Sequence, residues 1–276
     1  MTSANVVGYQ EITIPGNPSG TAYTMFAVTF KNPTTGSYPI KDIEVLDADG
    51  HVFDGVTYKS VNNVQIQKIE GNVCAVDNAT TYQFTTAKPS GKPMVGWHDM
   101  TAKTTTLDAS VVVSNGVGFL VCNTQNADVK FRFSGEVEIT PMSFEIPCKA
   151  DGTAYSIFGN FTPTPISIKD IRVLNRDKNV FDGVTYKSAN KVKIQKIKGN
   201  TCAVSDATTY TFNSTILKDH TDPIGWHDQS KKTTTIDASV VVSNGVGFLV
   251  SNSQEADVKL RFSGEVEIAP MSFEIP

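Results

Sequence analysis

The stretch Asp128–Ile139, DVKFRFSGEVEI, alternates polar and apolar positions along its whole length. Charged or hydroxyl side chains occupy every second position, and the positions between them hold Val129, Phe131, Phe133, Gly135, Val137 and Ile139. A period of two residues is typical of a β-strand that buries one face. The stretch therefore predicts a long half-buried strand, and its glycine predicts a local bend or bulge.

The same stretch returns as DVKLRFSGEVEI at Asp257–Ile268, inside a longer repeat. Gly96–Pro147 matches Gly225–Pro276 at 43 of 52 positions, and Asp54–Phe84 matches Asp182–Phe212 at 23 of 31. Identity at this level over two long stretches indicates a tandem duplication. What is predicted for one copy is therefore predicted for the other.

The rest of each copy also has the pattern of short strands. Ser110–Val121 holds two apolar runs around an Asn-Gly turn, and Ser239–Val250 repeats them. No window of a dozen residues has a helical amphipathic pattern. The sequence predicts an all-β protein of two tandem homologous β-sandwich domains, residues 1–147 and 148–276. A jelly-roll topology fits this pattern, although the sequence leaves the strand order open.

One short strand motif occurs more often than the domains do. The hexapeptide MSFEIP stands at Met142–Pro147 and again at Met271–Pro276. The tetrapeptide GTAY begins five residues after Pro147, and it follows Pro15 of the related EITIP, Glu11–Pro15, at the same offset. If the motif belongs to the domain after it, the copy at 271–276 is left over. If it belongs to the domain before it, the copy at 11–15 is left over.

Either reading leaves one alternating strand without an equivalent place in its own chain. A sheet edge of a neighbouring molecule would satisfy its backbone groups and bury its apolar side chains. Such a contact is head to tail, and it generates a homo-oligomeric ring or an open filament. The alternative is that the extra strand lengthens a sheet in its own chain. The residues predicted for the assembly strands are Met271, Phe273, Ile275, Ile12 and Ile14.

The motif GWHD also occurs in both copies and offers a second kind of site. Trp97 and Trp226, together with Tyr58 and Tyr186, are candidates for stacking on a glycan. The adjacent His and Asp point to opposite faces of a strand, which argues against a catalytic relay. Packing of the two tryptophans in the core is the other interpretation. The sequence contains no recognised catalytic motif, so we do not expect an enzyme.

Metal and cofactor sites are not expected either. Asp47–Gly55, DADGHVFDG, spaces its oxygen donors somewhat like a calcium loop. Its counterpart, Asn175–Gly183, brings in Arg176 and Lys178, whose charges oppose a cation. We interpret both as β-turns. The four cysteines, Cys74, Cys122, Cys148 and Cys202, are expected to be free thiols, because the second copy replaces Cys122 with Ser251.

Composition excludes some partners. The net charge of −4 gives no electrostatic reason to expect nucleic acid. No apolar run approaches the ~20 residues that cross a membrane, so we expect no membrane insertion. A charged and apolar leader is not recognisable at Met1. Either the chain stays inside the cell or a leader has been removed.

The segments VVGYQEITIP, FDGVTYKS, GWHD and SGEVEI together resemble a group of secreted bacterial repeat proteins of the Verrucomicrobia–Lentisphaerae branch. The resemblance spans nearly both copies and implies export and an extracellular or cell-surface location. It carries over no catalytic residue. The leading hypothesis is a secreted structural subunit that assembles head to tail into a fibre, sheath or surface layer. A tandem carbohydrate-binding protein of the cell surface is the alternative.

Overall fold

The computed structural model describes most of both sequence copies. It covers residues 7–20, 22–31, 36–54, 64–68, 80–86, 95–100, 110–114, 116–137, 142–148, 152–160, 164–181, 192–196, 208–213, 224–230 and 239–262. We call the part from residue 7 to 137 the first half and the part from 142 to 262 the second half.

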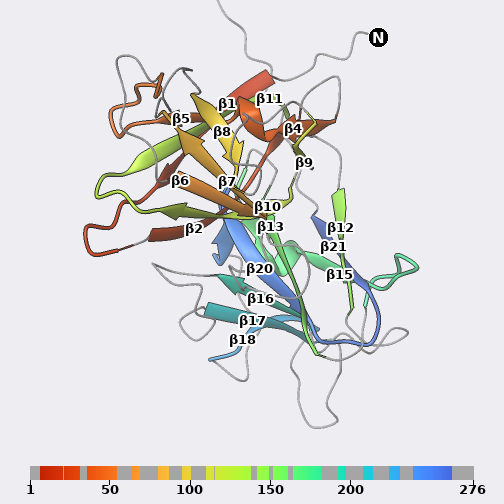
Figure 1. Cartoon of the computed structure of the whole chain (residues 1–276). Coiled ribbons are helices and arrows are strands. Elements are labelled where there is room, and N and C mark those ends of the chain that lie inside the picture. The colour runs from red at the N-terminus through yellow and green to blue at the C-terminus, as the bar shows by residue number, and fades with distance from the viewer. Residues whose placement is uncertain are drawn as a thin grey trace, which may run out of the picture.

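Antiparallel strands make up nearly all of the regular structure (Figure 1). The strands of the first half are β1 (Val7–Ile14), β2 (Ala22–Ala27), β3 (Phe30–Lys31), β4 (Ser37–Pro39), β5 (Glu44–Leu46), β6 (Val64–Lys68), β7 (Thr80–Thr85), β8 (Gly96–Asp99), β9 (Val112–Ser114), β10 (Gly118–Asn123) and β11 (Val129–Val137). Helical structure in the described residues consists of the short turns η1 (Ile40–Asp42) and η3 (Ile168–Asp170). Neither turn has the length or the apolar content that crossing a bilayer requires. The all-β prediction is confirmed.

The second half repeats the strand order of the first. Its strands are β12 (Met142–Ile146), β13 (Ala154–Gly159), β14 (Ile166–Ser167), β15 (Arg172–Leu174), β16 (Val192–Lys196), β17 (Thr208–Asn213), β18 (Gly225–Asp228), β19 (Val241–Val242), β20 (Gly247–Asn252) and β21 (Val258–Phe262). One sheet runs β2-β10-β6-β7-β8 in the first half and β13-β20-β16-β17-β18 in the second. The sheet that faces it is built on β11 in the first half and on β21 in the second.

Each half has its own aromatic core between the two sheets. The inward residues of β11 are Val129, Phe131 and Phe133, all at most 1% exposed, as the alternating pattern predicts. Trp97 of β8 lies against Phe84 and Phe131 at ring distances of 5.4 and 5.6 Å. Each half is thus a β-sandwich-like unit that buries its own apolar faces.

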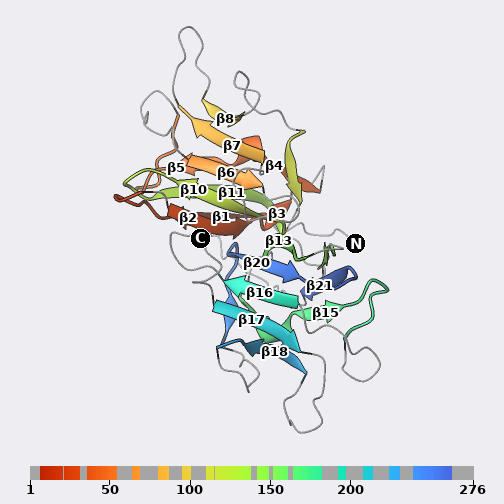
Figure 2. The same ribbon diagram turned by 60° about the horizontal axis from the view of Figure 1, so that its bottom comes forward.

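The two halves also pack against each other through equivalent residues. Met25 and Leu120, on the outer face of the first half, form a buried cluster with Ile157 and Leu249 of the second. The backbone contacts are equivalent too, since the amide of Ala27 donates to Gly245 at 3.0 Å and that of Gly159 donates to Gly116 at 3.1 Å. Figure 2 shows β2 and β10 lying next to β13 and β20. The contact therefore has an approximate two-fold symmetry.

Close approach of the two backbones requires Gly159. A Cβ added there would lie 2.4 Å from the Cβ of Ala27 and 2.7 Å from the carbonyl oxygen of Val246. We expect Gly159→Val to lower the free energy of unfolding by about 1–3 kcal/mol, because the halves must separate to admit the side chain. Urea unfolding measures this loss.

The exposed substitution Lys169→Ala is the control, and it should change the free energy of unfolding by less than about 0.5 kcal/mol. An unchanged stability of Gly159→Val would contradict the close contact between the halves.

Candidate assembly site

The Ile-Pro strand motif pairs with the half that follows it in the sequence. β1 is antiparallel to β11, with Ile12 opposite Phe131 and Ile14 opposite Val129. β12 is antiparallel to β21, and Ile146 lies opposite Val258. The domain boundary predicted at Pro147 leaves β12 in the first unit, whereas its hydrogen bonds join the sheet of the second half. We call the places occupied by β1 and β12 the first and second strand sites.

Apolar side chains anchor the strand in each site. Ile14 and Ile146 are fully buried, and Phe144 is 7% exposed. Phe144 packs on Phe158 and Phe262 at ring distances of 5.0 and 5.4 Å. Ile12 holds the place of Phe144 in the first strand site and is only partly buried against the core. The predicted assembly residues Ile12 and Ile14 therefore lie in a strand site.

A buried asparagine holds the backbone at the end of each strand. The amide of Asn123 donates to the carbonyl oxygens of Pro15 and Ala127, both at 3.1 Å, and its own oxygen accepts from the amide of Gln125 at 3.0 Å. Asn252 makes the same contacts with Pro147 at 3.3 Å, Ala256 at 3.1 Å and Gln254 at 3.0 Å. Both asparagines are fully buried. Each fixes the position of the proline relative to the following loop.

An aspartate completes the contact just after the proline. Asp128 accepts a hydrogen bond from the amide of Gly16 at 2.8 Å, and Asp257 accepts one from the amide of Cys148 at 2.7 Å. The backbone amide and the thiol of Cys148 hold the pKa of Asp257 below its usual value. The same carboxylate raises the pKa of the Cys148 thiol. The charged form of the aspartate is the form that holds the strand.

The polar faces of the strands carry different ion pairs. In the first strand site Arg132 donates to Glu11 at 2.7 and 2.9 Å and also contacts Glu44 at 3.4 Å. In the second site Lys259 lies 3.5 Å from Glu145. These groups are partly exposed, so they set the pairing register more than they stabilise it.

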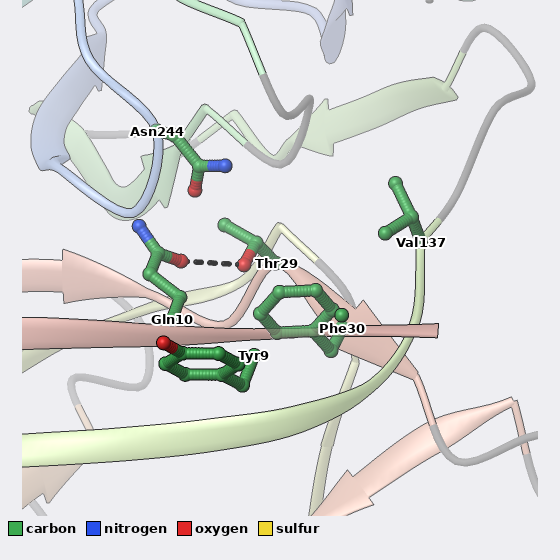
Figure 3. A pocket seen from close by; sticks show the side chains of 7 residues that line it. Tyr9, Gln10, Thr29, Phe30, Val137 and Asn244 are labelled. Carbon is green, nitrogen blue, oxygen red and sulfur yellow. Dashed lines mark hydrogen bonds between the residues drawn. The ribbon is translucent and has the colours of Figure 1, made fainter. Parts of the chain in front are cut away.

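A pocket of about 260 Å³ opens beside β1, between the two halves (Figure 3). Gln10, Thr29 and Asn244 point toward one another in it, and the hydroxyl of Thr29 donates to Gln10 at 2.7 Å. Among the described residues the buried side-chain oxygen of Asn244 has no hydrogen-bond partner. Tyr9 lies on the other side of the strand and is 72% exposed. The first strand site is therefore less tightly filled than the core below it.

Trp97 and Trp226, the candidates for glycan contact, lie in the cores, as the packing interpretation of the GWHD motif predicts. Trp97 and Trp226 are each 1% exposed, and their indoles donate to the carbonyl oxygens of Ile43 at 2.9 Å and Ile171 at 2.8 Å. Neither ring presents a face on which a sugar could stack. Their partners in that prediction, Tyr58 and Tyr186, lie outside the described residues.

Two other predicted features have structural counterparts. The β-turn interpretation of the segment at Asp47 is confirmed, because Gly50 donates to Asp47 at 3.1 Å and its counterpart Lys178 donates to Asn175 at 3.0 Å. Cys122 is buried and Cys148 is partly exposed, and neither is in a disulfide bond. Cys74 and Cys202, like Met271, Phe273 and Ile275, lie outside the described residues.

The asparagine and aspartate of the strand sites were not predicted from the sequence. The signal for them is the hexapeptide NTQNAD at Asn123–Asp128, which returns as NSQEAD at Asn252–Asp257. Its conserved spacing between the copies indicates one shared task. The chain of 276 residues contains two such hexapeptides and three copies of the Ile-Pro motif.

Comparison of the chain with protein-family models, with curated proteins and with solved structures gives no match. The function is therefore inferred from the contacts within the chain.

The asparagine contact predicts a large effect of a small substitution. We expect Asn123→Ala to lower the free energy of unfolding by about 1–3 kcal/mol, because it removes the buried donor that the carbonyl oxygens of Pro15 and Ala127 share. Urea unfolding measures the loss. Asn126→Ala, in the exposed part of the same loop, is the matched control. A loss no larger than that of the control would show that the contact is dispensable.

The aspartate contact predicts a dependence on pH. Because the pKa of Asp257 is lowered in the folded state, its contribution is complete above the unfolded value of about 3.9 and is lost as the pH falls through the lower folded value. The stability difference between the wild type and Asp257→Ala should be constant from pH 7 to about pH 5 and shrink below about pH 4. Urea unfolding at a series of pH values tests this. A difference that grows on acidification would contradict the assignment.

Proposed function

We propose that the chain is a non-catalytic structural subunit of an extracellular fibre, sheath or surface layer. In this assembly the strand Met271–Pro276 of one copy pairs with a sheet of the next copy. The observation that carries the proposal is the occupancy of the strand sites. Among the described residues both are filled by the motif copy that precedes the half, so neither site is open to the third copy.

The chemistry of the third strand matches that of a strand that is bound in this way. Met271–Pro276 is identical in sequence to Met142–Pro147, which fills the second strand site. By this identity Phe273 and Ile275 correspond to the buried anchors Phe144 and Ile146. Left unpaired, these side chains and the backbone groups between them would face water. Pairing with a second copy satisfies both, and the resident strand that is displaced there becomes the unpaired one.

Exchange between copies costs little free energy. A strand that replaces an equivalent strand regains the hydrogen bonds that its predecessor gives up, as in domain swapping. The donated strand and the site that receives it are different surfaces of the chain, so the contact does not close on a dimer. Repetition of the contact produces a ring or an open filament. The exported location that the sequence resemblance implies is consistent with this role.

The experiment compares the purified full-length chain with three variants by electron microscopy and sedimentation. Deletion of Ser272–Pro276 removes the strand, and Ile275→Asp places a charge at the position of a fully buried anchor. Ser272→Asp is the matched control, because the equivalent Ser143 is exposed. We expect rings or filaments from the wild type and the control, and monomers from the other two.

Monodisperse particles from all four proteins over a wide range of concentration would refute the proposal. Filaments that survive both the deletion and Ile275→Asp would refute the role of the strand.

A further inference from the structure

The proposed function leaves open which of the two strand sites receives the donated strand. In the second site the resident strand is MSFEIP itself, so an incoming copy of the same hexapeptide gains no contact by replacing it. In the first site the resident strand is QEITIP, in which Ile12 stands where Phe144 stands in the other. Ile275 matches Ile14, so of the two apolar anchors the incoming strand differs from its competitor at this one.

The first strand site has the partners that the phenylalanine ring uses in the second. Phe26 and Phe133 are the counterparts of Phe158 and Phe262, which hold the ring of Phe144. Phe26 and Phe133 are buried, with their rings 5.5 Å apart. A third aromatic ring would therefore meet the same kind of surface.

A glycine of the other half covers each strand site. The ring of Phe144 crosses Gly116, where an added Cβ would lie 2.1 Å from the ring. Gly245 is the equivalent glycine above the first strand site, with a φ of 71° against 77° at Gly116. An added Cβ at Gly245 would lie 2.6 Å from the side-chain nitrogen of Gln10 and 2.8 Å from the end of the Ile12 side chain. Ile12 thus occupies a place that holds an aromatic ring in the second site.

We infer that the first strand site is the receiving site, and that Ile12 makes β1 a weaker resident strand that Phe273–Ile275 of a second copy displaces. This inference rests on the proposed function. Because β1 competes with the donated strand for the same site, the stability of its pairing with β11 sets the protein concentration at which copies join. The pocket beside Gln10 adds free volume at the neighbouring inward position, which Met271 would take.

The charged residues do not oppose the exchange. The incoming strand places Ser272 where Glu11 contacts Arg132, and Arg132 keeps its contact with Glu44. It places Glu274 where Thr13 lies opposite Lys130. The equivalent residues in the second site, Glu145 and Lys259, form an ion pair at 3.5 Å. One exposed pair replaces another, so the gain from the aromatic side chain is set against the loss of the hydrogen bond from Thr29 to Gln10.

Two substitutions in the full-length chain should therefore both weaken assembly. One changes the donated strand and the other changes the resident strand. Phe273→Ile removes the advantage of the incoming strand, and Ile12→Phe gives that advantage to β1. We expect each to raise the concentration at half-assembly by about tenfold. Sedimentation over a concentration series measures it, and thermal unfolding checks that Ile12→Phe remains folded.

A cross-link identifies the site directly. Residues directly opposite in an antiparallel pair have Cα atoms about 4.5–5.5 Å apart, within reach of a disulfide. Lys130→Cys combined with Glu274→Cys should give a ladder of disulfide-linked oligomers on a non-reducing denaturing gel. The two single variants are the controls for the native cysteines.

The outcomes separate the two proposals. Assembly without the ladder, and without an effect of Ile12→Phe, would overturn the inference while leaving the proposed function intact. A cross-linked monomer would place the strand on β11 of its own chain and overturn both. Absence of assembly and of any cross-link would also overturn both.

Discussion

The buried amide of an asparagine fixes the chain at the point where each half begins. Asn123 and Asn252 connect the carbonyl oxygen of a proline to the loop between the last two long strands. Proline has no amide hydrogen and cannot extend a sheet ladder by donation, and its carbonyl oxygen accepts from the buried side chain instead. Because this partner sits in the half that follows the proline, the Ile-Pro strand belongs to that half. The two strand sites are filled in this way, while the sequence holds three copies of the motif.

The symmetry of the contact between the halves limits how copies can join. Equivalent residues from both halves meet there, and each face is covered by the other. A further copy cannot use the same face without opening the pair. In the proposed assembly the donated strand is therefore the connection between copies, and each chain remains a closed pair of halves.

Much of the fold could be predicted from the sequence because it depends on local periodicity. The alternation at Val129–Phe133 and the Asn-Gly turns specify strands without reference to distant residues. The half with which the Ile-Pro strand pairs could not be predicted, because its alternating pattern fits a sheet of either neighbouring half equally well. It depends on Asn123, more than a hundred residues from the proline it contacts.

The candidate site also contains some residues that could be predicted from the sequence and others that could not. Ile12 and Ile14 could be chosen from alternation alone, whereas Asn123 and Asp128 resemble ordinary loop residues until the strand is placed beside them. For the tryptophans the sequence leaves both interpretations open, because an indole ring can stack on a ligand or pack in a core and the neighbouring residues do not indicate which. Trp97 and Trp226 pack, because strands on both sides of them enclose the rings.

A reconstruction of the assembled protein by electron cryomicroscopy, at a resolution that traces individual strands, tests the central claim most directly. The account predicts density for Met271–Pro276 antiparallel to β11 of a neighbouring copy, with its isoleucine buried below the loop of Asn123. Density that places this segment in a sheet of its own chain, or copies joined through another surface, would contradict it.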